Sequence, residues 1–246
     1  MRLKCIACDA LARPIYLGAA MSCHVVDVVL ESYGQHINPV KLREKLQSHI
    51  DACNRSDPYD AIVLAYGLCG KATEGITARH IPVVIPKAHD CITLFLGDRA
   101  RYTQAFTDCP GTYWFVQDYI ERGNSSNIPL SIGANTVGDE AAVYAEFVQK
   151  FGEDNADYLM TVLGAWKENY QRAVFIDLKG GNSTSALSKA RDEAQRNGWR
   201  FERMAGDIGL LVRLLNGEWE RDDFLVLQPG QQVEMTGGDE IIHAVG

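Results

Sequence analysis

The sequence predicts an α/β protein built on mostly parallel sheets with flanking helices. Short hydrophobic runs alternate with helical patterns along the 246 residues, which is typical of strand-helix-strand units. Hydrophobic residues make up 46% of the chain and charged residues 23%, as in an ordinary globular protein. This composition excludes a disordered or fibrous chain, and the length suffices for one large α/β domain or two smaller lobes.

Eight hydrophobic runs have the length and residue preference of buried strands. They lie at about 2–8, 24–30, 60–66, 81–86, 112–117, 172–178, 199–204 and 223–227. The clearest helix runs from about Pro39 to Cys53, because proline suits a first helical turn and Val40, Leu42, Leu46, His49 and Ile50 give a partly apolar face. Further helices are expected at about 91–106, 138–152, 154–170, 184–197 and 207–216.

The predicted elements divide into two Rossmann-like lobes. Residues 1–120 form an N-terminal αβ lobe and residues 138–246 a C-terminal αβ lobe. Between them, residues 121–137 are rich in Gly, Asn and Ser and lack periodicity, so we expect a linker or an excursion there. A cleft between two such lobes is a common place for a small-molecule substrate.

The charge balance and the cysteine content limit the expected binding partners and the expected cellular compartment of the protein. Twenty-four Lys and Arg against 32 Asp and Glu give a net charge of −8 with no segregated basic patch, so nucleic acid is not an expected partner. No apolar run approaches the roughly 18 residues of a membrane span. The start of the chain is expected to be a strand and not a signal peptide. Seven cysteines without an export signal indicate free thiols and a cytoplasmic protein.

Three of the cysteines share one kind of position. Cys8, Cys69 and Cys91 each follow a separate predicted strand. Because the carboxyl ends of parallel strands meet at one edge of a sheet, we expect the three thiols to converge there. Gly67 and Gly70 flank Cys69 and allow backbone angles that would present its sulfur inward.

His89 stands two residues before Cys91 and completes a candidate metal site. Thiolate and imidazole are the ligands that zinc prefers, so Cys8, Cys69, His89 and Cys91 are candidate zinc ligands. The three cysteines are equally suited to a [4Fe-4S] cluster with one iron open to substrate, in which case His89 would be a catalytic proton relay. Taken singly, each cysteine is also compatible with ordinary core packing, which is the interpretation for Cys23, Cys53 and Cys109.

One further loop is compatible with anion binding. Gly180-Gly181 lies between a predicted strand and a predicted helix, where backbone N–H groups can bind a phosphate or carboxylate. It lacks the full pattern of a P-loop or a dinucleotide fingerprint, so a plain turn with Ser183 or Asn182 as helix cap is the favoured interpretation.

The cysteine motifs resemble those of the prokaryotic family of domain of unknown function 1638. The resemblance rests on three segments: Ile6-Ala7-Cys8, Tyr66-Gly67-Leu68-Cys69-Gly70 and His89-Asp90-Cys91-Ile92. It implies a cytosolic α/β protein associated with corrinoid-dependent methyl-transfer systems, with a corrinoid protein as a partner.

Three functions agree with these observations. The first is a zinc-dependent enzyme, such as a methyltransferase, that activates a thiol or transfers a methyl group, since zinc lowers the pKa of a bound thiol. The second is an iron–sulfur enzyme of the dehydratase or desulfurase kind with an open iron. The third is a non-catalytic accessory protein that binds a metal or serves a corrinoid system.

Overall fold

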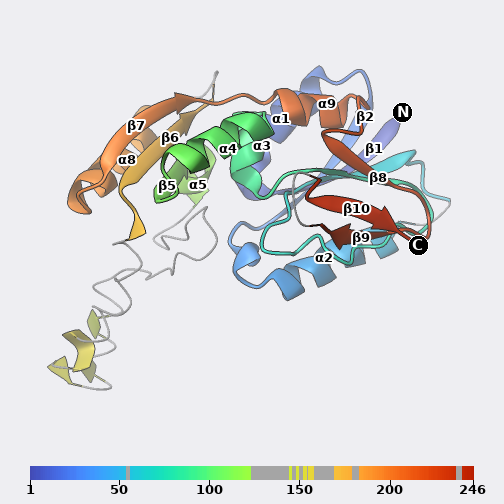
Figure 1. Ribbon diagram of the computed structural model, residues 1–246. Coiled ribbons are helices and arrows are strands. Elements are labelled where there is room, and N and C mark those ends of the chain that lie inside the picture. Colours follow the sequence, from blue (N-terminus) through green and yellow to red (C-terminus); the bar gives the residue numbers. More distant parts are fainter. Residues whose placement is uncertain are drawn as a thin grey trace. The chain divides into compact units, whose positions relative to one another are not determined.

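The computed structural model describes residues 1–53, 56–122, 169–178, 183–236 and 240–246, with short pieces at 144–145, 148–149, 152–153 and 155–157 (Figure 1). The chain forms two compact units. The first combines Met1–Tyr102 with Gly206–Gly246, and the second is Thr103–Ala205.

The first unit is built on a five-stranded sheet in the order β2-β1-β3-β4-β8. Four strands run parallel and the edge strand β8 pairs antiparallel with β4, so the expected mostly parallel sheet is confirmed. Their bounds are β1 Arg2–Cys8, β2 Val25–Glu31, β3 Ala61–Ala65, β4 Val83–Pro86 and β8 Phe224–Leu227.

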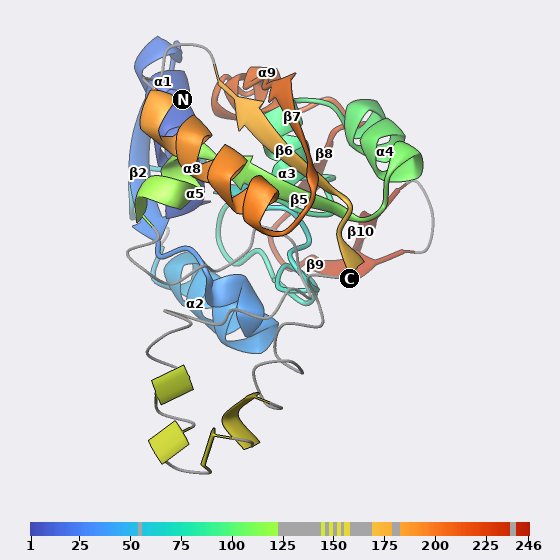
Figure 2. The same cartoon turned by 90° about the vertical axis from the view of Figure 1, so that its left-hand side faces the viewer.

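Helices cover both faces of this sheet. Figures 1 and 2 show α1 and α9 on one side and α2 on the other. In α2, Asn38 caps the first turn by accepting from the Lys41 amide at 3.1 Å, and the expected apolar stripe packs on the sheet. The bounds are α1 Ala12–Met21, α2 Pro39–Asp51, α3 Cys91–Leu96, α4 Arg99–Asp108 and α9 Gly209–Leu215, with short 3-10 turns at Asp9–Leu11 and Gln35–Ile37.

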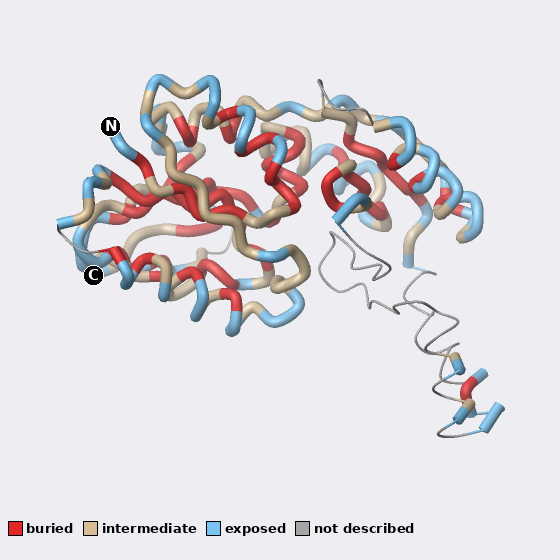
Figure 3. Tube along the Cα trace, turned by 180° about the vertical axis from the view of Figure 1, so that it is seen from behind, coloured by how far each residue is buried: buried red, intermediate tan, exposed pale blue. Residues whose placement is uncertain are grey.

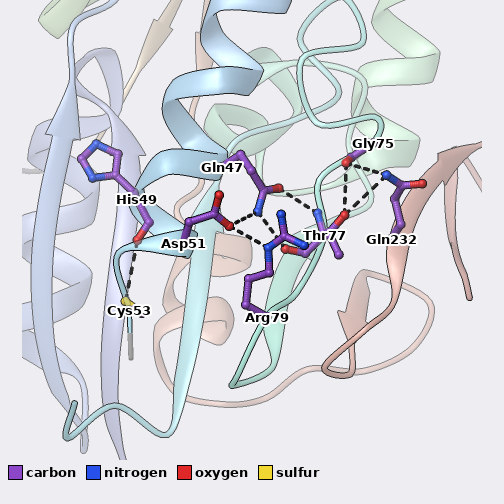
Figure 4. A network of polar contacts seen from close by, with 8 residues as sticks. All are labelled: Gln47, His49, Asp51, Cys53, Gly75, Thr77, Arg79 and Gln232. Atoms are coloured by element: carbon purple, nitrogen blue, oxygen red, sulfur yellow. Dashed lines mark hydrogen bonds and ion pairs between the residues drawn. The ribbon is translucent and has the colours of Figure 1, made fainter. Parts of the chain in front are cut away.

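The long loop between β3 and β4 is fastened to α2 and to a C-terminal hairpin. The hairpin consists of β9 (Gln232–Met235) and β10 (Ile242–Val245), two short strands that the sequence analysis did not predict. Figure 4 shows the contacts: the Thr77 amide donates to Gln47, Arg79 pairs with Asp51 at 2.7 Å, and Gln232 donates to the Gly75 carbonyl. These contacts hold the distal part of the loop that begins beyond β3.

The second unit contains a three-stranded parallel sheet in the order β5-β6-β7. Its helix α8 packs three alanines, spaced four residues apart, against the aromatic residues of the sheet. Figure 3 shows the buried inner strands of both units. The bounds are β5 Thr112–Val116, α5 Gln117–Arg122, β6 Arg172–Asp177, α8 Thr184–Arg196 and β7 Arg200–Ala205.

The structure corrects the expected division of the chain. Residues 206–246 belong with the N-terminal unit and not with a 138–246 lobe, because β8 pairs with β4 and the hairpin joins the same core. The expected helix at 91–106 is split into α3 and α4 at Gly97, whose φ of 73° ends the first helix. The sequence analysis also missed α1. Most of the expected linker 121–137, the expected helices 138–152 and 154–170, and Gly180-Gly181 lie outside the described residues.

Candidate functional site

The sheet of the first unit has a topological switch point between β1 and β3. The chain passes from β1 to β2 on one side and then returns to β3 on the other side of β1. Helices α1 and α2 consequently lie on opposite faces, and a crevice outside the carboxyl ends of such strands is the usual ligand site of an open α/β sheet.

Cys8, Cys69 and Cys91 belong to this carboxyl edge. Cys8 is the last residue of β1, Cys69 lies four residues beyond β3, and Cys91 lies five residues beyond β4. These three strands are neighbours and run in the same direction, so all three cysteines follow carboxyl ends at one edge. The Cys69 side chain is buried, whereas Cys8 and Cys91 are partly buried.

Backbone hydrogen bonds join the two loops that carry Cys69 and His89. The Leu68 amide donates to the Ala88 carbonyl at 2.7 Å, and the Cys69 amide donates to the His89 carbonyl at 3.0 Å. Gly67 makes this approach possible, since a Cβ there would lie 2.7 Å from the Asp90 Cα. Position 67 therefore requires glycine for a steric reason, since any side chain there would collide with the backbone at Asp90.

The backbone at Cys69 is strained. Cys69, Gly70 and Lys71 have φ angles of 45°, 67° and 75°, so three successive residues adopt the left-handed region. For cysteine and lysine this conformation is costly, and such strain persists where the surrounding structure enforces it, commonly at functional sites. The expected unusual backbone angle is confirmed at Gly70 but not at Gly67, and Cys69 and Lys71 also adopt positive φ.

The three thiols interact electrostatically. Burial raises the pKa of Cys91 well above its usual value, and negative charge on Cys69, Asp90 and Cys8 raises it further. Burial likewise raises the pKa of Cys69, with further contributions from Asp90 and Cys8. The Cys69 and Cys91 thiols are therefore neutral in the absence of a cation, because burial and negative neighbours disfavour their ionised forms.

Asp90 lies between His89 and Cys91 in the sequence motif, but the motif predicted no role for it. Its carboxylate caps α3 by accepting from the Ile92 amide at 3.0 Å, and it accepts from the Tyr102 hydroxyl at 3.2 Å. Burial raises the pKa of Asp90 to about 6 despite these hydrogen bonds. The local sequence around Asp90 indicates only a helix cap. The raised pKa of Asp90 depends on burial by the folded chain and could not be predicted from the sequence.

His89 has an exposed side chain. Partial burial and the charge of Arg99 lower the pKa of His89, so the imidazole is neutral at pH 7. Its ring lies 6.2 Å from the Tyr102 ring, centroid to centroid. The His89 backbone thus contacts the loop that carries Cys69, whereas the His89 imidazole is exposed to solvent.

A second imidazole, that of His49, pairs with the residue that lies opposite Cys8 in the sheet. Glu31 is the register partner of Cys8 across β1 and β2, and it accepts from His49 at 2.6 Å, from Lys45 at 3.1 Å and from Gln35 at 3.1 Å. The sequence analysis counted His49 with the apolar face of its helix, and the structure corrects this because the imidazole pairs with a carboxylate. Recognising the pair required knowing that α2 packs over the end of β2.

The described parts of the chain contain no group of three or more His, Cys, Asp or Glu side chains already arranged around a metal position. The chemistry of the three sulfurs is that of ligands for a thiophilic metal. The same described segments include no helix with the length and apolarity of a membrane span.

The chain matches the family described as protein of unknown function (DUF1638) over residues 31–215, which is more than half of its length, and it belongs to that family. Cys69, His89 and Cys91 lie inside the matched region, and Cys8 lies before it. No curated protein and no solved structure matches the chain.

Proposed function

We propose that Cys8, Cys69 and Cys91 hold a metal centre that activates a small thiol or a methylated compound. The observation that carries the proposal is the position of the cysteines, which follow three neighbouring parallel strands and interact electrostatically. Zinc and iron–sulfur clusters both take thiolate ligands. A bound cation would offset the cost of ionising buried thiols, so metal binding and deprotonation of the cysteines would occur together.

Zinc is the first candidate, and in such a site it would supply a Lewis acid that stabilises a substrate thiolate for methyl transfer. Asp90 lies next to Cys91 and has a pKa of about 6, which suits acceptance of the thiol proton near neutral pH. The Tyr102 hydroxyl orients this carboxylate by donating to it. His89, neutral and exposed, is placed to pass the proton on to solvent. For methyl transfer, the expected partner is a corrinoid protein.

An iron–sulfur cluster is the second candidate, and the exposure of His89 favours it. With the imidazole at the solvent side, the ligand set consists of three thiolates. Three cysteines are enough to hold a four-iron cluster with one iron open to a small substrate. A brown protein with visible absorption supports this candidate, and a colourless protein with bound zinc supports the first.

The test is the metal content of protein purified without oxygen. Cys69→Ser should lose most of the bound metal because a ligand at a loop end is removed. Cys53→Ser is the matched control, since Cys53 is equally buried but lies beyond α2 with the Lys4 amine 3.2 Å from its sulfur. Full metal content in the Cys69→Ser variant would contradict the proposal.

A further inference from the structure

The hydroxyl of Tyr66 is a buried polar group without a partner. Tyr66 follows β3 directly and is 3% exposed, and its oxygen has no hydrogen-bond partner among the described residues. Buried hydroxyl groups in folded proteins almost always have a partner, and each exception calls for an explanation. A ligand that is bound in the working protein is one such explanation.

The surroundings of Tyr66 identify the edge at which its hydroxyl lies. Besides burial, negative charge on Cys8, Cys69, Glu31 and Asp9 raises the pKa of Tyr66. Tyr66 also belongs to the hydrophobic cluster on the α2 face of the sheet, against which Cys8 packs. Because Tyr66 directly follows β3 and shares this cluster with Cys69, it lies at the carboxyl edge together with two of the three candidate metal ligands.

Two carboxylates lie at the same edge, Glu31 at the end of β2 and Asp9 just after β1, and both accept hydrogen bonds from other groups. Glu31 accepts from His49, Lys45 and Gln35. The Oδ1 of Asp9 accepts from the Tyr33 amide at 2.5 Å. A phenol hydroxyl donates a hydrogen bond, and an acceptor atom of a molecule bound at this edge would satisfy it.

We propose that the Tyr66 hydroxyl donates a hydrogen bond to the small substrate bound at the Cys8, Cys69 and Cys91 site, and so orients it. The inference rests on the proposed function and narrows the substrate to a compound with an acceptor atom, such as thiolate sulfur, next to its reacting centre. Tyr66 is in this account a substrate-binding residue and not a metal ligand.

The experiment compares full-length wild-type protein with Tyr66→Phe after removal of bound metal and addition of Co²⁺. The absorption band from thiolate to cobalt reports metal binding, and its change on addition of 2-mercaptoethanol gives the affinity for a thiol probe. Tyr66→Phe should bind Co²⁺ within about twofold of wild type and bind the thiol about tenfold more weakly, the loss of roughly one hydrogen bond. Its melting temperature should equal or exceed that of wild type, because no internal hydrogen bond is lost.

Tyr59→Phe is the matched control. Tyr59 precedes β3 and lies at the opposite edge of the sheet, where Asp27 accepts its hydrogen bond. This variant should bind 2-mercaptoethanol as wild type does. Equal thiol affinity in Tyr66→Phe, or a melting temperature several degrees below wild type, would overturn the assignment of Tyr66 alone. Absence of the cobalt band in wild type would overturn the proposed function and this inference with it.

Discussion

The backbone amide of Cys69 donates to the carbonyl of His89 at 3.0 Å. Together with the Leu68 to Ala88 bond, this contact continues the pairing of β3 and β4 beyond the ends of the strands. Cys91 follows His89 by two residues, so the backbone fixes the loops of two candidate ligands against each other. Main-chain hydrogen bonds thus organise the candidate site.

Gly67→Ala should destabilise the first unit. The new Cβ would lie 2.7 Å from the Asp90 Cα and nitrogen and 2.9 Å from the Ala88 carbonyl oxygen, all of them backbone atoms. Overpacking of this kind costs about 1–3 kcal/mol. Urea denaturation measures it, and Gly198→Ala is the control because its Cβ meets nothing within 4 Å and only the left-handed backbone is strained. Unchanged stability of Gly67→Ala would show that the loops separate without cost.

The free energy of unfolding should fall as the pH rises from about 4 to about 6, because the buried Asp90 ionises in this range. Its folded pKa of about 6 lies above the usual aspartate value, so the folded state binds more protons than the unfolded state in this window. The protonated form therefore contributes stability at low pH that is lost as the pH passes through about 6. Asp90→Asn, which keeps a good helix cap, should remove this slope. If wild type and Asp90→Asn showed the same pH dependence of the unfolding free energy between pH 4 and 6, the raised pKa of Asp90 would be contradicted.

Glu31 should have the opposite dependence. Burial raises its pKa, but hydrogen bonds from His49, Lys45 and Gln35 outweigh burial, and the net pKa is lowered. Its stabilisation is therefore present at neutral pH and is lost as the pH falls through the lowered folded pKa. Glu31→Gln should lose about 1–3 kcal/mol at pH 7 and approach wild type in acid. Asp27→Asn is the control, with a loss under about 1 kcal/mol, since the ion pair of Asp27 with Arg2 is exposed. If Glu31→Gln and Asp27→Asn lost similar amounts of unfolding free energy at pH 7, the hydrogen bonds to Glu31 would not have the stabilising role expected here.

His89→Ala should retain its metal. The imidazole is exposed and the three thiols suffice as ligands in this account. Metal analysis of protein purified without oxygen checks this outcome. Loss of metal in the variant would mean that the imidazole turns inward and ligates, as the zinc interpretation of the sequence expected.

The sequence predicted the parallel strands well, most clearly β3, β4 and β5, because a buried parallel strand is a continuous apolar run that can be recognised without knowing its neighbours. The placement of Cys8, Cys69 and Cys91 at one edge followed from the same topology. The hairpin of β9 and β10 was missed since Gln232–Met235 is short and partly polar, and it is stabilised by contacts distant in sequence.

Other features depend on burial in three dimensions and had no local signal. The raised pKa of Asp90 and the unpartnered hydroxyl of Tyr66 result from what packs around them. The return of β8 to pair with β4 likewise requires the folded sheet, which is why the division of the chain was predicted wrongly.

X-ray absorption at the metal edge of wild-type protein purified without oxygen tests the central claim most directly. The energy of the edge identifies zinc or iron, and the fine structure counts the sulfur ligands. We expect at least three sulfur neighbours at about 2.3 Å, the usual zinc–thiolate distance, or the sulfur and iron shells of a cluster. Protein without bound metal, or metal bound only by oxygen and nitrogen, would contradict it.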